Sequence, residues 1–362
     1  MREPRLPAAI ELDGDGAHPA AWRYSGRRPG AVLTAGALRE GVAAAEAAGF
    51  TLATFDDTPV PPHAAVNAAG RLEAGTRAAF AATITERIGL APALHATTTE
   101  PFHLATQLAS LDHAGRGRAA WLVGAANDPE SAATIGAAPL APEELRREVR
   151  DVVDAARLLW DSWEDDAVIK DAATGRFLDA ARVHHVDFEG ARFTVKGPLI
   201  TPRPPQGQVV VLAPAALGLG ARADIALVGG RDTAALRERA AAARKAGAPL
   251  AFAEIEVVLA ETDASAAGRA AQLEEAAAWP DTGRFRYVGS AVGFAGLLRS
   301  LAGDVDGVRL HPAVLAADLP LLAEHVLPAL EAAGLHRPPA PGATLRESLG
   351  LPRPANRFTA AS

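Results

Sequence analysis

The chain has 362 residues, 49% of them hydrophobic, and carries 36 basic and 43 acidic side chains for a formal net charge of −7. It contains no cysteine, which excludes disulfides, thiolate nucleophiles and cysteine-ligated metals. The mildly acidic balance gives no electrostatic footprint for nucleic acid or an anionic membrane. The N-terminal segment has no apolar core of signal-peptide length, and no uninterrupted apolar stretch is long enough to span a membrane. We therefore expect a soluble, cytoplasmic protein that binds neither nucleic acid nor membrane.

Signals for helices and strands alternate along most of the chain. A helix is predicted over 38–48, ending at Gly49, and a short strand over 50–55 leads into Asp56 and Asp57. Further helices are predicted over 77–87, 143–160, 233–246, 264–278 and 319–333, and further strands over 209–213, 225–228, 250–259 and 308–310. We therefore expect an α/β fold, a (β/α)8 TIM barrel that forms a single domain over 1–362.

One βαβ unit gives the most specific local pattern. An apolar run over 88–94 has strand length and suits a strand buried on both faces of a parallel sheet. A polar loop leads to a helix that begins near Pro101, where the missing N–H costs little, and a strand resumes over 119–123. The unit places His95 at the carboxyl end of a strand, the edge where such sheets bind ligands.

The segment 163–207 differs in character from the rest of the chain. It is polar, is interrupted by Gly and Pro, and contains only short alternating runs such as 191–195. Barrel strands and helices show longer periodic patterns. We therefore expect this segment to be an excursion inserted into the barrel.

Five sequence blocks carry a resemblance to a known family. They are TERIGL (85–90), PFHLATQLASLDHAGRGRAAW (101–121), LLWDSWEDDAVIKDAATGRF (158–177), VDFEGARFTVKGPLITPRPPQGQVVVLAP (186–214) and TLRESLGLPRPANR (344–357). In this order they resemble the bacterial-luciferase-like flavin-dependent monooxygenases, above all the branch of nitrilotriacetate, EDTA and dibenzothiophene-sulfone monooxygenases. The resemblance covers most of the chain and includes the excursion.

The resemblance implies a flavin-dependent oxidoreductase. Such an enzyme is a two-component monooxygenase, in which reduced FMN (FMNH2) from a separate flavin reductase and O2 oxidise a small organic substrate at the barrel mouth. The deazaflavin F420 is the alternative cofactor. The resemblance also implies that the C-terminal tail, 338–362, packs on the barrel or on a neighbouring subunit, and hence a homodimer.

The loop after the strand at 88–94 supplies the predicted catalytic group. His95 is the candidate proton donor or flavin partner, with a solvent-facing loop histidine as the alternative. Thr97, in the same loop, is a candidate cofactor contact. Asp57 stands with Asp56 where the family keeps an Asp near the flavin. Trp121 either forms a wall of the flavin pocket or belongs to the core.

Three further residues are candidates for holding the cofactor phosphate. Arg146 stands at a family Tyr position and suits a phosphate. Gly218, together with Gly220, offers backbone amides. Ala216 lies in the segment where the family carries a phosphate-binding Ser, so this position is predicted to lie at the cofactor without a hydroxyl.

Several polar contacts of the family are replaced in this chain. Leu122 and Ala125 stand where the family has Asn and Thr, and Pro142 stands at a family His. These replacements leave open a degenerate family member that has lost or altered its flavin binding, without a cofactor, and serves as a non-catalytic partner subunit or binds another ligand. A metal-dependent barrel hydrolase is a third alternative, but its HxH pattern is absent, so no metal site is predicted.

Overall fold

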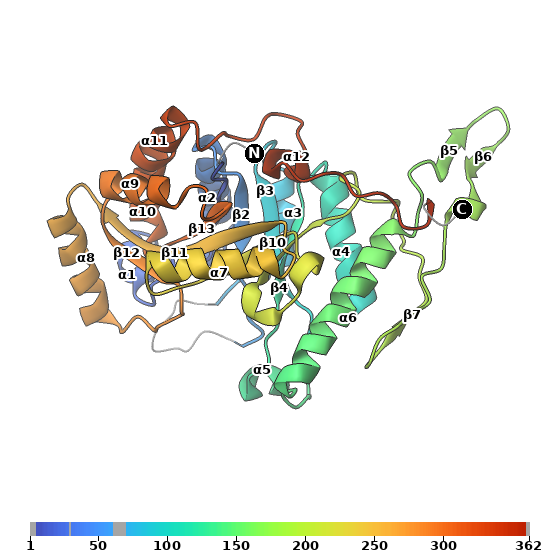
Figure 1. Cartoon of the computed structure of the whole chain (residues 1–362), viewed down its shortest axis with the longest axis horizontal. Coiled ribbons are helices and arrows are strands. Elements are labelled where there is room, and N and C mark those ends of the chain that lie inside the picture. The colour runs from blue at the N-terminus through green and yellow to red at the C-terminus, as the bar shows by residue number, and fades with distance from the viewer. Residues whose placement is uncertain (1–4, 29, 61–69, 360–362) are drawn as a thin grey trace.

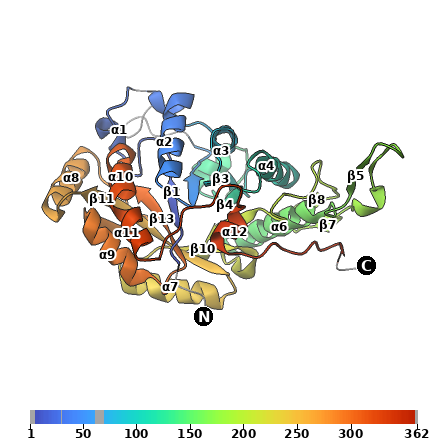
Figure 2. The same cartoon turned by 90° about the horizontal axis from the view of Figure 1, so that it is seen from above.

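A computed structural model describes residues 5–28, 30–60 and 70–359. Within these residues, eight parallel strands form a closed barrel (Figures 1 and 2). They are β1 (Ala8–Glu11), β2 (Leu52–Phe55), β3 (Gly89–His95), β4 (Ala120–Gly124), β9 (Val210–Pro214), β10 (Ile225–Val228), β11 (Leu250–Ala260) and β13 (Gly307–Pro312). Each pairs with the next in this order, and β13 pairs with β1 to close the ring. The predicted TIM barrel is confirmed.

The period of two along each strand separates the barrel interior from the layer beneath the helices. Apolar side chains fill the lower interior, namely Ala9, Leu52, Ala91, Ala93, Ala120, Leu122, Val210, Leu212, Ile225, Leu227, Leu250 and Phe252. The short helix α12 (Leu345–Leu349) adds Leu345 and Leu349 to the same cluster. Because α12 lies at the amino ends of the strands, it closes the bottom of the barrel and leaves the carboxyl ends open.

Helices cover the outer face of the barrel, as Figure 2 shows. They are α2 (Ala35–Ala47), α3 (Ala74–Ala82), α4 (Pro101–Ala114), α6 (Pro142–Asp161), α7 (Thr233–Lys245), α8 (Asp263–Ala276), α9 (Ala291–Leu301), α10 (Leu315–Leu321) and α11 (Leu327–Ala332), with shorter α1 (Ala21–Tyr24) and α5 (Pro129–Ala133). The start of α4 agrees with the sequence prediction: Pro101 opens the helix and the Glu100 carboxylate accepts from the backbone N–H groups of Phe102 and His103.

The element predictions need correction in one helix and in the elements that they lacked. The helix predicted over 77–87 is α3, which starts at the Glu73 cap and ends before Thr83. Residues 84–87 instead form an irregular segment, where the Glu46 carboxylate accepts from three successive backbone N–H groups at 86–88. The predictions also lacked β1, the helix α9 and the strand β12 (Phe285–Ser290), which pairs only with the outer half of β11.

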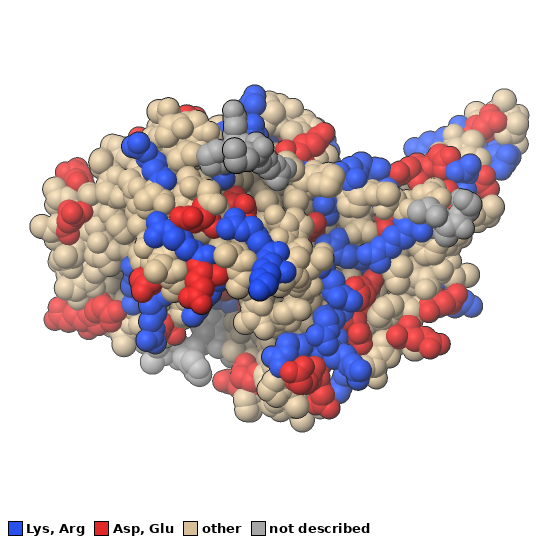
Figure 3. All heavy atoms as spheres, viewed as in Figure 1, with Lys and Arg blue, Asp and Glu red and all other residues tan. Residues whose placement is uncertain are grey.

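The segment 163–207 lies outside the barrel sheet. It contains two antiparallel ribbons, β5 (Val168–Asp171) with β6 (Arg176–Leu178) and β7 (Phe188–Glu189) with β8 (Thr194–Val195). The β5–β6 ribbon projects as an arm from the body of the molecule (Figures 1 and 3). The base of the arm is held by the C-terminal tail, because Asn356 donates to the carbonyls of Asp161 and Trp163.

The surface agrees with the modest net charge. On the face drawn in Figure 3, basic and acidic side chains are interspersed. Within the described ranges, no helix is both long enough and apolar enough to cross a bilayer.

Candidate active site

The interior side chains change from apolar to charged toward the carboxyl ends of the strands. One position above the apolar layer, the inward side chains are Glu11 on β1, Thr54 on β2, Glu254 on β11 and Arg309 on β13. His311 follows Arg309 by two residues and faces the same way. We call these five residues the charged layer. They form the floor of the barrel mouth.

Arg309 is the centre of the charged layer. Its Nη1 donates to Glu254 Oε1 at 2.8 Å, its Nε donates to Thr54 Oγ1 at 3.0 Å, and its Nη2 pairs with Glu11. The Thr54 hydroxyl in turn donates to Glu11 Oε2 at 2.6 Å. All three partners are buried or nearly so, and the arginine is therefore held rigidly between two carboxylates.

Burial and these charges shift the pKa values in the layer. Burial, with the nearby Arg309 and Arg284 charges, lowers the pKa of His311 to about 3, so at neutral pH the ring is neutral and donates from Nε2 to Glu254 Oε1 at 3.3 Å. Burial acts to raise the pKa of Glu254, but the His311 hydrogen bond and Arg309 hold it well below its usual range. Burial raises the pKa of Glu11 despite Arg309.

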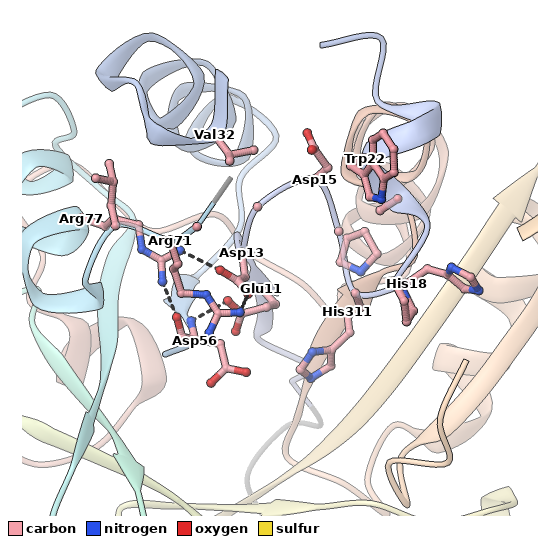
Figure 4. Close-up of a pocket in the computed structure, with 18 of the residues that line it drawn as sticks. Glu11, Asp13, Asp15, His18, Trp22, Val32, Asp56, Arg71, Arg77 and His311 are labelled. Carbon is pink, nitrogen blue, oxygen red and sulfur yellow. Dashed lines mark hydrogen bonds and ion pairs between the residues drawn. The ribbon is translucent and has the colours of Figure 1, made fainter. Parts of the chain in front are cut away.

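A cavity of about 280 Å³ lies above one side of the charged layer. We call it the charged chamber. Figure 4 shows Glu11, Asp13, Asp56, Arg71 and Arg77 gathered on one side of it, with His18 and Trp22 on the other. Asp13 is the acceptor of both arginines, from Arg71 Nη2 at 2.6 Å and from Arg77 Nη1 at 3.1 Å.

A second cavity, of about 530 Å³, lies at the ends of β2 and β3. We call it the His95 chamber. Its wall combines polar side chains, Asp57, His95, Thr98 and Thr99, with apolar ones. Gly70 and Arg71 line both chambers, so the two cavities are neighbours across one thin wall.

The structure places His95 between the ends of three strands. Its Nδ1 accepts from the backbone N–H of Ala126, after β4, at 3.1 Å. The proton therefore sits on Nε2, which donates to the Asp57 carbonyl, after β2, at 3.1 Å. Gly124 makes this arrangement possible, because a Cβ there would lie 2.6 Å from His95 Nδ1. His95 thus ties neighbouring loops together while its ring lines the His95 chamber.

Asp57 and Thr97 lie close to His95 but use their polar side-chain atoms within the protein. The Asp57 carboxylate accepts from the backbone N–H groups of Thr58 at 2.8 Å and Ala74 at 2.7 Å, which fixes the start of α3. Thr97 Oγ1 donates to the Ala126 carbonyl at 2.8 Å. Asp56, not Asp57, is the carboxylate of this pair that lines the charged chamber.

Trp121 lies apart from this group. Its side chain is fully buried in the layer between barrel and helices, and its Nε1 donates to the Leu94 carbonyl at 2.9 Å. Of the two interpretations that the sequence left open for Trp121, this placement matches the core residue.

The predicted phosphate residues meet on the far side of β4 from His95. A Cβ added to Gly218 would lie 3.8 Å from Arg146 Cδ, so the glycine backbone and the arginine stem are neighbours. Gly218 and Ala216 are exposed, just after β9. Arg146, near the start of α6, pairs with Glu143 one turn earlier. Since β3, β4 and β9 are successive strands, this corner lies two strands along the barrel from His95.

The charged layer, His18 and Arg284 were not among the predicted site residues. Their sequence signal is faint: charged residues alternate with apolar ones within otherwise buried strands, as in Glu254 and Glu256 of β11 or Arg309 and His311 of β13. Among the residues that the structure describes, no three His, Asp or Glu side chains are placed to hold a metal ion.

Comparison with known sequences gives relatives over the whole length of the chain and over part of it. N-acetyl-S-(2-succino)cysteine monooxygenase of Bacillus subtilis (strain 168) is 25% identical over 99% of this chain and 99% of its own. Dibenzothiophene-sulfone monooxygenase of Rhodococcus erythropolis is 39% identical over 39% of this chain and 31% of its own. Both relatives are named as monooxygenases.

Solved structures share the fold. EDTA monooxygenase from Chelativorans sp. BNC1 superposes with a TM-score of 0.84, at 21% identity, over 96% of this chain and 99% of its own. A riboflavin lyase determined with modified FMN and riboflavin gives a TM-score of 0.85, at 23% identity, over 96% of both chains. An F420-dependent secondary alcohol dehydrogenase gives 0.62, at 17% identity, over 91% of this chain and 99% of its own.

The family model described as luciferase-like monooxygenase matches residues 17–320. This range includes seven of the eight barrel strands and the excursion. It also includes the residues that line the two chambers, except those before residue 17, such as Glu11, Asp13 and Asp15. The chain is therefore an enzyme of the flavin-dependent luciferase-like monooxygenase family.

Proposed function

We propose that this protein is the oxygenase component of a two-component monooxygenase. It takes reduced FMN from a separate flavin reductase in the cytoplasm and uses O2 to oxidise a small organic substrate. The observation that carries the proposal is the His95 chamber: a cavity of ligand size at the carboxyl ends of the strands, in a chain of the luciferase-like family.

The residues present fit FMN, with its phosphate at the corner of Arg146 and Gly218 and its flavin ring in the His95 chamber. At the corner of Arg146 and Gly218, the stem of the arginine lies beside an exposed glycine, where a phosphate can approach the backbone closely. The His95 chamber supports the ring position, since Ala93 and Leu94 give it apolar walls. FMN, when bound, supplies the reaction with O2.

The chain's own residues position the groups that take part in that chemistry. His95 holds the loops after β2 and β4 against each other through its two ring nitrogens. Thr97 adds a second tie to the same loop. Fixed loops around a partly apolar cavity hold the ring in one orientation. We assign His95 a positioning role with its Nε2 proton turned to Asp57.

The proposed phosphate site at Arg146 and Gly218 can be tested by measuring FMN binding. In an anaerobic titration with reduced FMN, followed by flavin fluorescence and by Tm, we expect saturable binding and a rise in Tm with ligand concentration. Arg146→Ala should weaken FMN binding at least tenfold, because it removes the cation that would bind the FMN phosphate. Arg147→Ala is the matched control, an exposed arginine on the same helix, and should bind as the parent does.

Other ligands decide between the remaining alternatives. Reduced F420 in place of FMN tests the deazaflavin. A protein that binds neither cofactor would be a non-catalytic partner subunit or a binder of another ligand. The homodimer is part of the proposal and is tested by sedimentation of the purified chain.

A further inference from the structure

The wall of the His95 chamber contains two hydroxyl groups that the reaction proposed above does not use. We propose that the substrates are small, uncharged and mostly apolar molecules, each with an oxygen acceptor that the hydroxyls of Thr98 and Thr99 bind. The inference rests on the proposed function in one respect: it takes the flavin ring and the substrate to share this chamber.

Two carboxylates line the chamber, and backbone N–H groups of the protein use both oxygens of each. Asp57 accepts from the N–H groups of Thr58 and Ala74. Glu73 caps α3: its Oε1 accepts from the N–H of Gly75 at 2.8 Å and its Oε2 from the N–H of Thr76 at 2.6 Å. Both carboxylates therefore lie at the amino end of α3, where the helix dipole stabilises their negative charge.

The basic side chains of the wall are also used within the protein. Arg71 is the only positively charged side chain among the described residues that line the chamber, and its Nη2 donates to Asp13 Oδ2 at 2.6 Å. His95 carries one ring proton, and both of its nitrogens are hydrogen bonded. An ionic ligand would lose its hydration and find no unpaired charge of opposite sign, which is unfavourable.

The hydroxyls of Thr98 and Thr99 differ from these groups. Both residues line the chamber and are half-buried. Among the described residues neither hydroxyl has a hydrogen-bond partner, and each keeps exposed surface, whereas the Thr97 hydroxyl donates to the Ala126 carbonyl. The backbone N–H groups of Thr98 and Thr99 both donate to the His95 carbonyl, at 3.2 and 3.0 Å, which fixes their positions. A hydroxyl is a donor, so these two can bind a carbonyl or another uncharged oxygen.

The remaining wall is apolar and suits the body of such a ligand. Pro59, Val60, Ala93 and Leu94 contribute to it. Burial of apolar surface against these side chains supplies affinity, and the hydroxyls supply orientation. The volume of about 530 Å³ lies in the range of pockets that hold drug-sized ligands, and a flavin ring with a small molecule beside it is of that size.

Three probes of similar shape separate an uncharged ligand from an ionic one. Acetophenone is uncharged, benzoate is an anion, and benzamidine is a cation at neutral pH. In calorimetric titrations of the flavin-free, full-length protein, acetophenone should bind at least tenfold more tightly than either ion, because neither ion finds an unpaired counter-charge. Absence of acetophenone binding, or equal affinity for either ion, would overturn the inference.

Valine matches threonine in shape and therefore tests the hydroxyls alone. The double variant Thr98→Val with Thr99→Val should weaken acetophenone binding about fivefold, the typical net effect of a hydrogen bond. It should leave the affinity for α-methylstyrene unchanged, because a CH2 group replaces the carbonyl oxygen in that probe. Thr83→Val is the matched control, at an exposed position where α3 ends, and should bind both probes as the parent does.

The Tm of each variant without ligand shows whether it is folded. Unchanged acetophenone affinity in the folded double variant would contradict the role of the two hydroxyls.

Reduced FMN distinguishes failure of this inference from failure of the proposed function. Under anaerobic conditions, acetophenone should still bind saturably when the protein is saturated with reduced FMN, and mutual exclusion of the two would overturn the shared chamber. FMN binding without a preference for acetophenone over the ions would overturn the substrate class alone. A preference for acetophenone without FMN binding would overturn the proposed function alone.

Discussion

At the scale of single residues, His95 carries more of the site than its side chain alone suggests. Both ring nitrogens are used, one toward the loop after β4 and one toward the loop after β2. The ring therefore positions two strand ends, and its loss affects both the site and the stability of the fold.

His95→Ala should lower the free energy of unfolding by about 1–2 kcal/mol, the net value of two hydrogen bonds, and weaken reduced-FMN binding at least tenfold because the loops lose their tie. Urea denaturation and the anaerobic titration measure the two effects. His103→Ala, at an exposed position of α4, should change neither. Parent-like FMN affinity in folded His95→Ala would refute the positioning role.

Gly124→Ala tests the same arrangement from the neighbouring strand β4. The added Cβ would lie 2.6 Å from His95 Nδ1 and 2.8 Å from Cε1, so the ring has to move and its hydrogen bonds break. We expect weaker FMN binding, as in His95→Ala. The control is Gly268→Ala in α8, where a Cβ meets nothing within 4 Å and should add about 0.5–1 kcal/mol of helix stability. If both substitutions leave FMN affinity unchanged, the contact is unimportant.

At the scale of elements, the closed bottom of the barrel separates stability from binding. Leu349 of α12 is 5% exposed and packs into the apolar lower interior, at the end opposite the two chambers. Leu349→Ala should lower the free energy of unfolding by about 2–4 kcal/mol and leave FMN affinity unchanged. Ile200→Ala, at a position 70% exposed, should stay within about 0.5 kcal/mol. Urea denaturation checks both, and a loss of FMN binding in folded Leu349→Ala would show that the ends are coupled.

The sequence predicts the elements better than it predicts their roles. Long periodic segments such as α6 and β11 lie close to their expected bounds. β1 was missed because it is a four-residue run, half of it alanine, too short to show a period. β12 was missed because it lies outside the barrel alternation, beside the extension of β11.

The site also contains residues that the sequence groups correctly and residues that it misses. The grouping of His95, Asp57 and Thr97 follows from strand ends in sequence order. The charged layer does not, because Glu11 and Arg309 are 298 residues apart and only the closing pair of β1 with β13 brings them together.

At the scale of the whole molecule, two buried acids change the stability in opposite directions as the pH changes. Glu254, with its lowered pKa, contributes stability that is lost on acidification. Asp112 on α4 acts in the other direction, because burial raises its pKa to about 6 even though its carboxylate accepts from the Ala119 N–H at 3.0 Å and from Gln206 Nε2 at 2.7 Å.

Asp112→Asn separates the two contributions. Between the unfolded pKa near 3.8 and the folded value of about 6, the folded state of the parent binds more protons than the unfolded state, so its stability falls as pH rises, by about 3 kcal/mol in total. The asparagine variant cannot ionise and lacks this term. The stability of Asp112→Asn relative to the parent should therefore rise between pH 4 and pH 7, as measured by urea denaturation at each pH. Parallel stability curves would mean that Asp112 titrates alike in both states.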